Sequence, residues 1–169
     1  MPRETITLGI DPGTARLGYG LIRGGLHPAL IDAGVIETWP DEPMAERLVT
    51  LYDGARELIE EFQPDVVAIE QLFFARNVTT AITVGQARGV VILAAAQAGI
   101  PVAEYTPSEI KHAIAGYGKA DKPQIQEMVR MILQLSTVPQ PDDAADALAV
   151  AICHAQTIPF EDRVKQGGR

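Results

Sequence analysis

The stretch Ile6-Thr7-Leu8-Gly9-Ile10-Asp11-Pro12-Gly13-Thr14 decides how the rest of the chain can be arranged. Its apolar residues alternate with smaller ones, as in a central strand that is covered on both faces. The Pro12-Gly13 turn then ends the strand and turns the backbone away. Asp11 therefore falls at the carboxyl end of an interior strand, where open α/β sheets bind their ligands. An ordinary surface acid at a turn is the simpler alternative, and this stretch alone does not exclude it.

The composition predicts a single packed domain, because the chain has 169 residues of which 47% are hydrophobic. We expect residues 1–158 to form this domain and residues 159–169 to be a polar, mobile tail. The single cysteine, Cys153, excludes an internal disulfide and fits a reducing compartment. No basic-then-apolar leader opens the chain, and its longest apolar run, residues 89–96, is shorter than the roughly 20 residues of a membrane span. These features predict a soluble, cytoplasmic protein with no membrane partner.

Charge is distributed unevenly along the chain, although the net charge is −8. Residues 37–65 hold nine acidic and two basic side chains, whereas residues 71–134 hold six basic and four acidic ones. One part of the fold can therefore be acidic while another is mildly basic. The net charge alone does not exclude a nucleic-acid partner.

The order of patterns predicts an α/β fold with a mixed five-stranded sheet flanked by helices. Strands at residues 17–22 and 29–38 would form an antiparallel meander with the first strand. An amphipathic helix from Met44 to Phe62 then leads to a buried strand at residues 65–70. This order predicts a right-handed crossover that places the fourth strand parallel to the first. The later elements are expected at residues 81–98 (helix), 101–105 (strand), 108–114 (helix), from Pro123 onward (helix) and 142–156 (helix).

The helix expected at residues 81–98 is apolar nearly all round and carries very small residues on much of its surface. Such a helix has to be covered on more than one side. In a small domain this pattern favours burial against a second copy of the chain.

Three further acids are expected near Asp11. Glu70 ends its strand as Asp11 ends the first, so both would lie at the same edge of the sheet. Capping of the last helix explains Asp142 or Asp143 well. It explains Asp146 poorly, because the rest of that helix is Ala, Leu and Val. Asp146 shares a helix face with either of the two earlier acids, and spacing alone does not choose between them.

Four convergent carboxylates would repel one another strongly without a cation. Ligand sets made only of oxygen suit Mg²⁺ or Mn²⁺, and two such ions about 3.5–4 Å apart support in-line displacement at phosphorus. No sequence motif of a Ser-His-Asp or Cys-His site surrounds His27, His112 or His154. The spacing therefore favours a metal-dependent phosphodiester hydrolase.

Four segments of the chain form a specific combination. They are Gly9-Ile10-Asp11-Pro12-Gly13-Thr14 with Gly18-Tyr19-Gly20, Ala68-Ile69-Glu70-Gln71-Leu72-Phe73, Gly85-Gln86-Ala87-Arg88-Gly89-Val90 and Asp143-Ala144-Ala145-Asp146-Ala147-Leu148-Ala149. Together these segments resemble the RuvC family of Holliday-junction resolvases, which have a ribonuclease H-like fold. The resemblance spans about residues 5–157, with the segments in order and at fitting separations.

The resemblance implies that Asp11, Glu70, Asp143 and Asp146 are the catalytic and metal-binding acids, which selects Asp143 over Asp142. It implies a crossover junction endodeoxyribonuclease that acts as a homodimer in recombination and DNA repair. Such an enzyme nicks two strands of like polarity across a four-way junction, using two Mg²⁺ ions per site, with Mn²⁺ as a possible substitute. It also implies partnership with the branch-migration proteins RuvA and RuvB.

Several side chains are candidates for contacts with DNA. The family places an aromatic at Phe73 near the junction centre, where stacking on a base could contribute about 1–3 kcal/mol, and Phe74 follows it. The cations Arg76, Lys111, Lys119 and Lys122 are candidate phosphate contacts. Lys111 and Lys122 match basic positions of the family, whereas Lys119 is supported only by its loop. Core aromatics and solvated surface cations are the simpler alternatives.

Two other functions compete with cleavage. One is a junction-binding protein without chemistry, against which the complete set of four acids argues. The other is a nucleotide-binding domain of the actin and sugar-kinase class, whose first phosphate loop also resembles residues 9–14. This chain has neither the length nor the second phosphate-binding loop of that class.

Overall fold

The computed structural model describes residues 3–71 and 77–167, with side chains as far as Ile158. The strands are β1 (Ile6–Asp11), β2 (Arg16–Arg23), β3 (Ala29–Glu37), β4 (Val66–Glu70) and β5 (Val102–Tyr105). The helices are α1 (Met44–Phe62), α2 (Val78–Gln97), α3 (Pro107–Ala115), α4 (Lys122–Ile132) and α5 (Asp142–Gly167). The strands lie in the order β3-β2-β1-β4-β5, antiparallel from β3 to β1 and parallel from β1 to β5. This arrangement confirms the predicted mixed five-stranded sheet.

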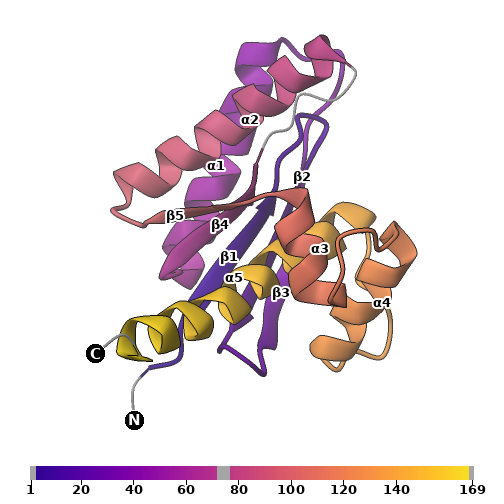
Figure 1. Cartoon of the computed structure of the whole chain (residues 1–169). Helices are drawn as coiled ribbons and strands as arrows, with labels where there is room; N and C mark the ends of the chain where they lie inside the picture. The colour runs from indigo at the N-terminus through magenta and orange to yellow at the C-terminus, as the bar shows by residue number, and fades with distance from the viewer. Residues whose placement is uncertain (1–2, 72–76, 168–169) are drawn as a thin grey trace.

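Helices cover both faces of the sheet, which is why β1 is buried from Ile6 to Ile10 (Figure 1). Leu8 and Ile10 point into the core beneath α1 and α2. Ile22 and Ala68 point to the opposite face, into a second core formed by α5 together with α3 and α4. Side chains of a strand alternate between the two faces, so two cores require apolar residues at both sets of positions.

The long helix α5 lies close against β1 and β2, because glycines face it. A Cβ atom at Gly9 would lie 2.1 Å from the carbonyl oxygen of Ala147. A Cβ atom at Gly18 would lie 2.1 Å from the carbonyl oxygen of Asp143. Only glycine allows the backbones to approach this closely. These contacts hold the first turns of α5 directly above the end of β1.

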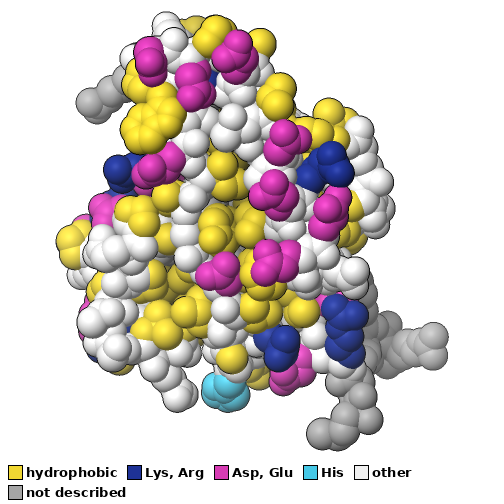
Figure 2. All heavy atoms as spheres, turned by 180° about the vertical axis from the view of Figure 1, so that it is seen from behind, with side chains coloured by type: hydrophobic (Ala, Val, Ile, Leu, Met, Phe, Trp, Pro, Cys, Tyr) yellow, Lys and Arg dark blue, Asp and Glu magenta, His cyan; other side chains and the backbone are white. Residues whose placement is uncertain are grey.

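The outer face of α1 carries much of the acidic excess. Asp53, Glu57, Glu60 and Glu61 are all exposed, while Leu51 and Ala55 are buried against the sheet. Seen from behind, Asp and Glu side chains outnumber Lys and Arg over the upper half of the molecule (Figure 2). The amphipathic helix predicted from Met44 to Phe62 is therefore confirmed, and its exposed face is acidic.

The helix α2 is only partly covered within one chain. Ala87 and Val91 are fully buried, whereas Val78, Ile82 and Leu93 are 69%, 57% and 51% exposed. In the described part of the chain, α2 alone is long and apolar enough to cross a membrane, a test that the core helices of soluble proteins also pass. One face of α2 packs into the core beneath α1, and the opposite face remains apolar and open.

Several helix ends differ from the predicted ones. α2 begins three residues earlier than predicted, at Val78. α3 begins earlier, because Thr106 caps it through a reciprocal pair of hydrogen bonds with Glu109, of 3.1 and 2.7 Å. α5 continues to Gly167 instead of ending near Gln156. The hydroxyl of Thr157 donates to the carbonyl of Cys153 at 2.7 Å, as a residue inside a helix does. A domain boundary at residue 158 stays a prediction.

Candidate active site

The four predicted acids meet where the two central parallel strands end. Asp11 is the last residue of β1, and Glu70 is the last residue of the adjacent parallel strand β4. The first two turns of α5 carry Asp143 and Asp146 over these strand ends. One carboxylate oxygen from each of Asp11, Asp143 and Asp146 lies within 4.8 Å of the other two. All three side chains are half-buried, so the group is partly accessible to solvent.

Glu70 borders this three-oxygen group as its electrostatic neighbour. Burial, followed by the carboxylate of Asp146, raises the pKa of Glu70, and Lys111 acts in the opposite direction. Glu70 in turn contributes to raising the pKa of Asp11. Glu70 therefore interacts electrostatically with Asp11 and Asp146 even though it lies outside the three-oxygen group.

Asp11 is the most strongly perturbed carboxyl of the cluster. Burial and the charges of Asp146, Glu70 and Asp143 raise the pKa of Asp11 to about 8, against the opposing effect of Lys122. Asp11 therefore carries a proton at neutral pH when no cation is bound. A divalent ion would replace that proton and remove the repulsion. The donor set fits Mg²⁺ or Mn²⁺, because it consists of hard carboxylate oxygens and contains no sulfur or imidazole.

Asp142 and Asp143 have separate environments, although they are neighbours on α5. Asp143 belongs to the three-oxygen group. Asp142 points to Lys122, whose Nζ lies 3.6 Å from Asp142 Oδ2 and 3.3 Å from Asp146 Oδ2. The geometry thus selects Asp143 for the cluster, in agreement with the family pattern.

The candidate DNA contacts differ in how close they lie to the acids. Lys111 and Lys122 line a cavity of about 270 Å³ together with Glu70 and Asp146. Lys119 is exposed in the loop between α3 and α4 and does not line this cavity. Phe73, Phe74 and Arg76 lie outside the described residues.

Sequence reasoning missed the residues that hold the turn after Asp11. Thr38 is 4% exposed, its hydroxyl donates to the carbonyl of Thr14, and its N–H donates to Ala15 O at 3.0 Å. Arg47 Nε donates to the same hydroxyl at 2.8 Å. These contacts join the end of β3 and α1 to the loop beside the acids. No local pattern predicts them, because the partners are separated by nine to 24 residues.

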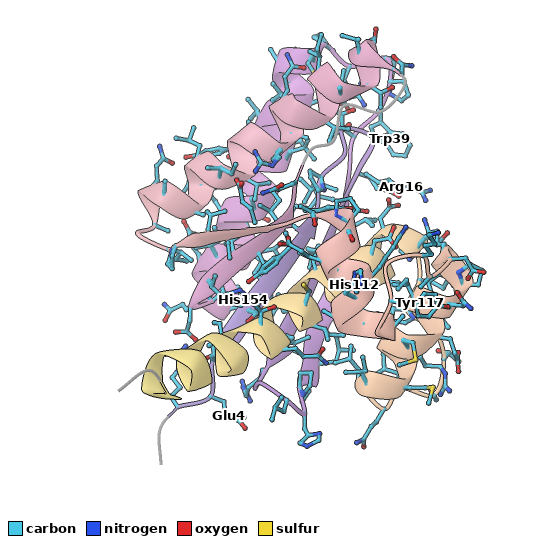
Figure 3. All side chains as sticks on the ribbon, viewed as in Figure 1. Glu4, Arg16, Trp39, His112, Tyr117 and His154 are labelled. Carbon is cyan, nitrogen blue, oxygen red and sulfur yellow. The ribbon has the colours of Figure 1, made fainter. Side chains whose placement is uncertain are left out.

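Histidine chemistry finds no support in the described part of the chain. His112 and His154 lie on different helices, α3 and α5 (Figure 3). His154 Nδ1 is 2.6 Å from the hydroxyl of Tyr105. His112 Nδ1 is 2.9 Å from the carbonyl of Ser108 and 3.4 Å from its hydroxyl, and both side chains are exposed. These contacts join the imidazoles to a tyrosine hydroxyl and to Ser108, and they do not build a Ser-His-Asp arrangement.

A sheet in this strand order, with acids at its central strand ends and on the helix that crosses them, defines a ribonuclease H-like protein. The family model described as "Crossover junction endodeoxyribonuclease RuvC" matches residues 7–154. The chain therefore belongs to the RuvC family of crossover junction endodeoxyribonucleases.

Similar proteins agree with this assignment over nearly the whole chain. The RuvC protein of Chloroflexus aggregans (strain MD-66 / DSM 9485) is 61% identical over 157 residues, which cover 92% of this chain and 96% of the relative. That of Roseiflexus sp. (strain RS-1) is 57% identical over 166 residues, covering 96% and 98%. The structure of T. thermophilus RuvC in complex with a Holliday junction substrate matches with a TM-score of 0.89 at 40% identity, covering 93% of this chain and 96% of that one.

Proposed function

We propose that this protein resolves Holliday junctions by two symmetric, Mg²⁺-dependent nicks during homologous recombination and DNA repair. The observation that carries the proposal is the three-oxygen group of Asp11, Asp143 and Asp146, at strand ends in a member of the RuvC family. The similar proteins are named as crossover junction endodeoxyribonucleases, and one solved relative holds a Holliday junction substrate.

Asp11, Asp143 and Asp146 would hold the metal, with Glu70 beside them completing a site for two ions. Bound Mg²⁺ supplies an activated water and stabilises the negative charge that develops at phosphorus. The carboxylates must be deprotonated to act as ligands, so Asp11 would lose its proton as the site fills. The turn at residues 12–14, whose Thr14 carbonyl accepts a hydrogen bond from Thr38, would leave room for a phosphodiester beside Asp11.

Lys111 and Lys122 would contact the strand that is cut, because both line the cavity with Glu70 and Asp146. Lys119 would contact the flanking backbone from the exposed loop before α4. Such contacts hold phosphates in place and make binding depend on salt. The family resemblance adds Phe73 and Phe74 as stacking side chains and Arg76 as a further phosphate contact.

A homodimer would present two such sites to one junction. The open face of α2 carries Val78, Ile82 and Leu93, four and eleven residues apart, which places them on one side of the helix. Gly89 lies between Ile82 and Leu93, and no atom lies within 4 Å of a Cβ placed there, so another chain could approach closely. A two-fold dimer matches the symmetry of a four-way junction.

RuvA and RuvB are the further partners that family membership suggests, and the cytoplasm is the proposed compartment.

Cleavage of a synthetic mobile junction tests the proposed function. All four strands are end-labelled in turn, and cleavage is measured with Mg²⁺ and with EDTA. The wild-type protein should make paired nicks in two strands of like polarity only with Mg²⁺. Asp11→Asn should bind the junction but not cut it, whereas Asp53→Asn, an exposed acid on α1, should cut normally.

The alternative functions give different results in the same experiments. Junction binding without nicks in any metal would favour a binding protein without catalysis. Binding of ATP in a calorimetric titration, together with no cleavage, would favour the nucleotide-binding class. Full activity of Asp11→Asn would contradict the assignment of the metal site.

A further inference from the structure

Asp142 is an acid in the first turn of α5 and does not belong to the three-oxygen group. Its side chain is 55% exposed and faces the ammonium of Lys122 at 3.6 Å. The same ammonium lies 3.3 Å from Asp146, whose side chain is 28% exposed. One cation is therefore shared between a proposed metal ligand and an acid outside the cluster.

Both ends of this ion pair are anchored, so only the side chains can adjust. Lys122 is the first residue of α4 and follows the N-cap Asp121. Asp121 and Gln124 form a reciprocal capping box with two hydrogen bonds of 2.9 Å, which holds the backbone at Lys122. Asp142 is likewise the first residue of α5. The distance between the two backbone positions is therefore set by the fold.

A metal ion on Asp146 would weaken the hold of this carboxylate on Lys122, because the two cations repel each other and share one negative charge. The ammonium then has two options. It can stay near the site by pairing with Asp142 alone, or it can move out into solvent.

We propose that Asp142 is a positioning residue that retains the Lys122 ammonium beside the site after Mg²⁺ takes its place on Asp146. The proposal rests on the proposed function, since it takes Asp146 as a metal ligand. Its consequence is that Lys122 remains within reach of the phosphate at the cut. A surface ion pair without this role is the alternative, because most exposed pairs contribute little.

Chemical labelling of lysines tests the proposal without a cleavage reaction. The DNA-free protein is acetylated with N-hydroxysuccinimidyl acetate at pH 7.5, with EDTA or with Mg²⁺, and the sites are quantified by mass spectrometry. Lys119, which is exposed and three residues away, is the internal reference. An ammonium held by a carboxylate reacts slowly, so the ratio of Lys122 to Lys119 labelling reports its release.

In wild-type protein, Mg²⁺ should change this ratio by less than about twofold. In Asp142→Asn, Asp146 still holds Lys122 in EDTA, and Mg²⁺ should raise the ratio about fivefold to tenfold. Asp142→Glu should behave as the wild type, because a carboxylate is restored. An equal response to Mg²⁺ in the wild type and Asp142→Asn would overturn the proposal.

Single-turnover cleavage at saturating Mg²⁺ gives a second readout. Asp142→Asn should slow cleavage about tenfold with unchanged junction affinity, and it should have no further effect in a Lys122→Gln background. Equal slowing in both backgrounds would show that Asp142 does not act through Lys122. Absence of cleavage by the wild type would contradict the proposed function itself, whereas normal wild-type cleavage with identical labelling responses would contradict only the role of Asp142.

Discussion

Substituting Gly18 by alanine is expected to disable the site without touching any of the four acids. Gly18 is paired with Asp11 in the β1–β2 ladder, and a Cβ atom there would lie 2.1 Å from the carbonyl oxygen of Asp143. An ordinary contact begins at 3.4 Å, so the first turn of α5 must move away by about 1.3 Å. The residue displaced is Asp143 itself, one of the three carboxylates whose oxygens lie within 4.8 Å of one another.

This displacement predicts effects on both stability and activity. Overpacking of a closely packed contact destabilises by about 1–3 kcal/mol, and each kcal/mol lowers Tm by about 2–4 °C for a domain of this size. A misplacement of about 1 Å at a catalytic group lowers the rate about 100-fold. The cleavage rate should therefore fall far more than the folded fraction does.

Single-turnover cleavage of a junction and thermal unfolding monitored by circular dichroism measure the two effects. Gly25→Ala is the matched control, because the nearest atom to a Cβ there lies at an ordinary 3.9 Å. It should retain both activity and Tm. If Gly18→Ala cleaved within threefold of the wild type with an unchanged Tm, the close approach of α5 would not be what places Asp143.

Two further predictions concern protonation and assembly. Because the pKa of Asp11 is raised from 3.8 to about 8 in the folded protein, the folded state keeps a proton that the unfolded chain has lost. The free energy of unfolding is measured by urea denaturation in EDTA. From pH 5 to pH 8 it should decrease more for the wild type than for Asp11→Asn. The same pH dependence in both proteins would contradict the raised pKa of Asp11. Ile82→Arg, on the open face of α2, should weaken the proposed dimer about tenfold or more in sedimentation equilibrium. Val49→Arg, which changes a residue on α1 that is 58% exposed, should leave the dimer intact, and equal effects of the two substitutions would place the interface elsewhere.

The sheet and the strand-end acids could be predicted because their signals are local. The apolar run that stops at Asp11 and the run that stops at Glu70 each define a buried strand and its end. The crossover rule then makes the two strands parallel, which brings the two acids to one edge. The structure confirms this edge, with Ile10 opposite Ile69.

Spacing along the sequence could not predict which acids of α5 join the cluster. Asp142 and Asp143 are both one turn from Asp146, so either could share its face. The choice depends on how α5 is rotated against the sheet, which the contact between Gly18 and the Asp143 backbone fixes. The pairing of Lys122 with Asp142 and Asp146 depends on how α4 packs against α5, and it joins residues 20 and 24 positions apart. No short pattern in the sequence carries that information.

The acids of this site destabilise the protein that holds them. Burial is the largest cause of the raised pKa values of Asp11, Glu70 and Asp146, and mutual repulsion adds to it. The core beneath α1 and α2 is complete without these side chains, since Leu8 and Ile10 fill β1 toward that core. Nothing in the packing therefore requires a carboxylate at the end of β1. Neutral substitution at Asp11 should stabilise the metal-free protein while it removes cleavage, which is the trade-off expected where a binding site opposes folding. A stable, inactive Asp11→Asn protein would support this reasoning, and one less stable than the wild type at pH 8 in EDTA would refute it.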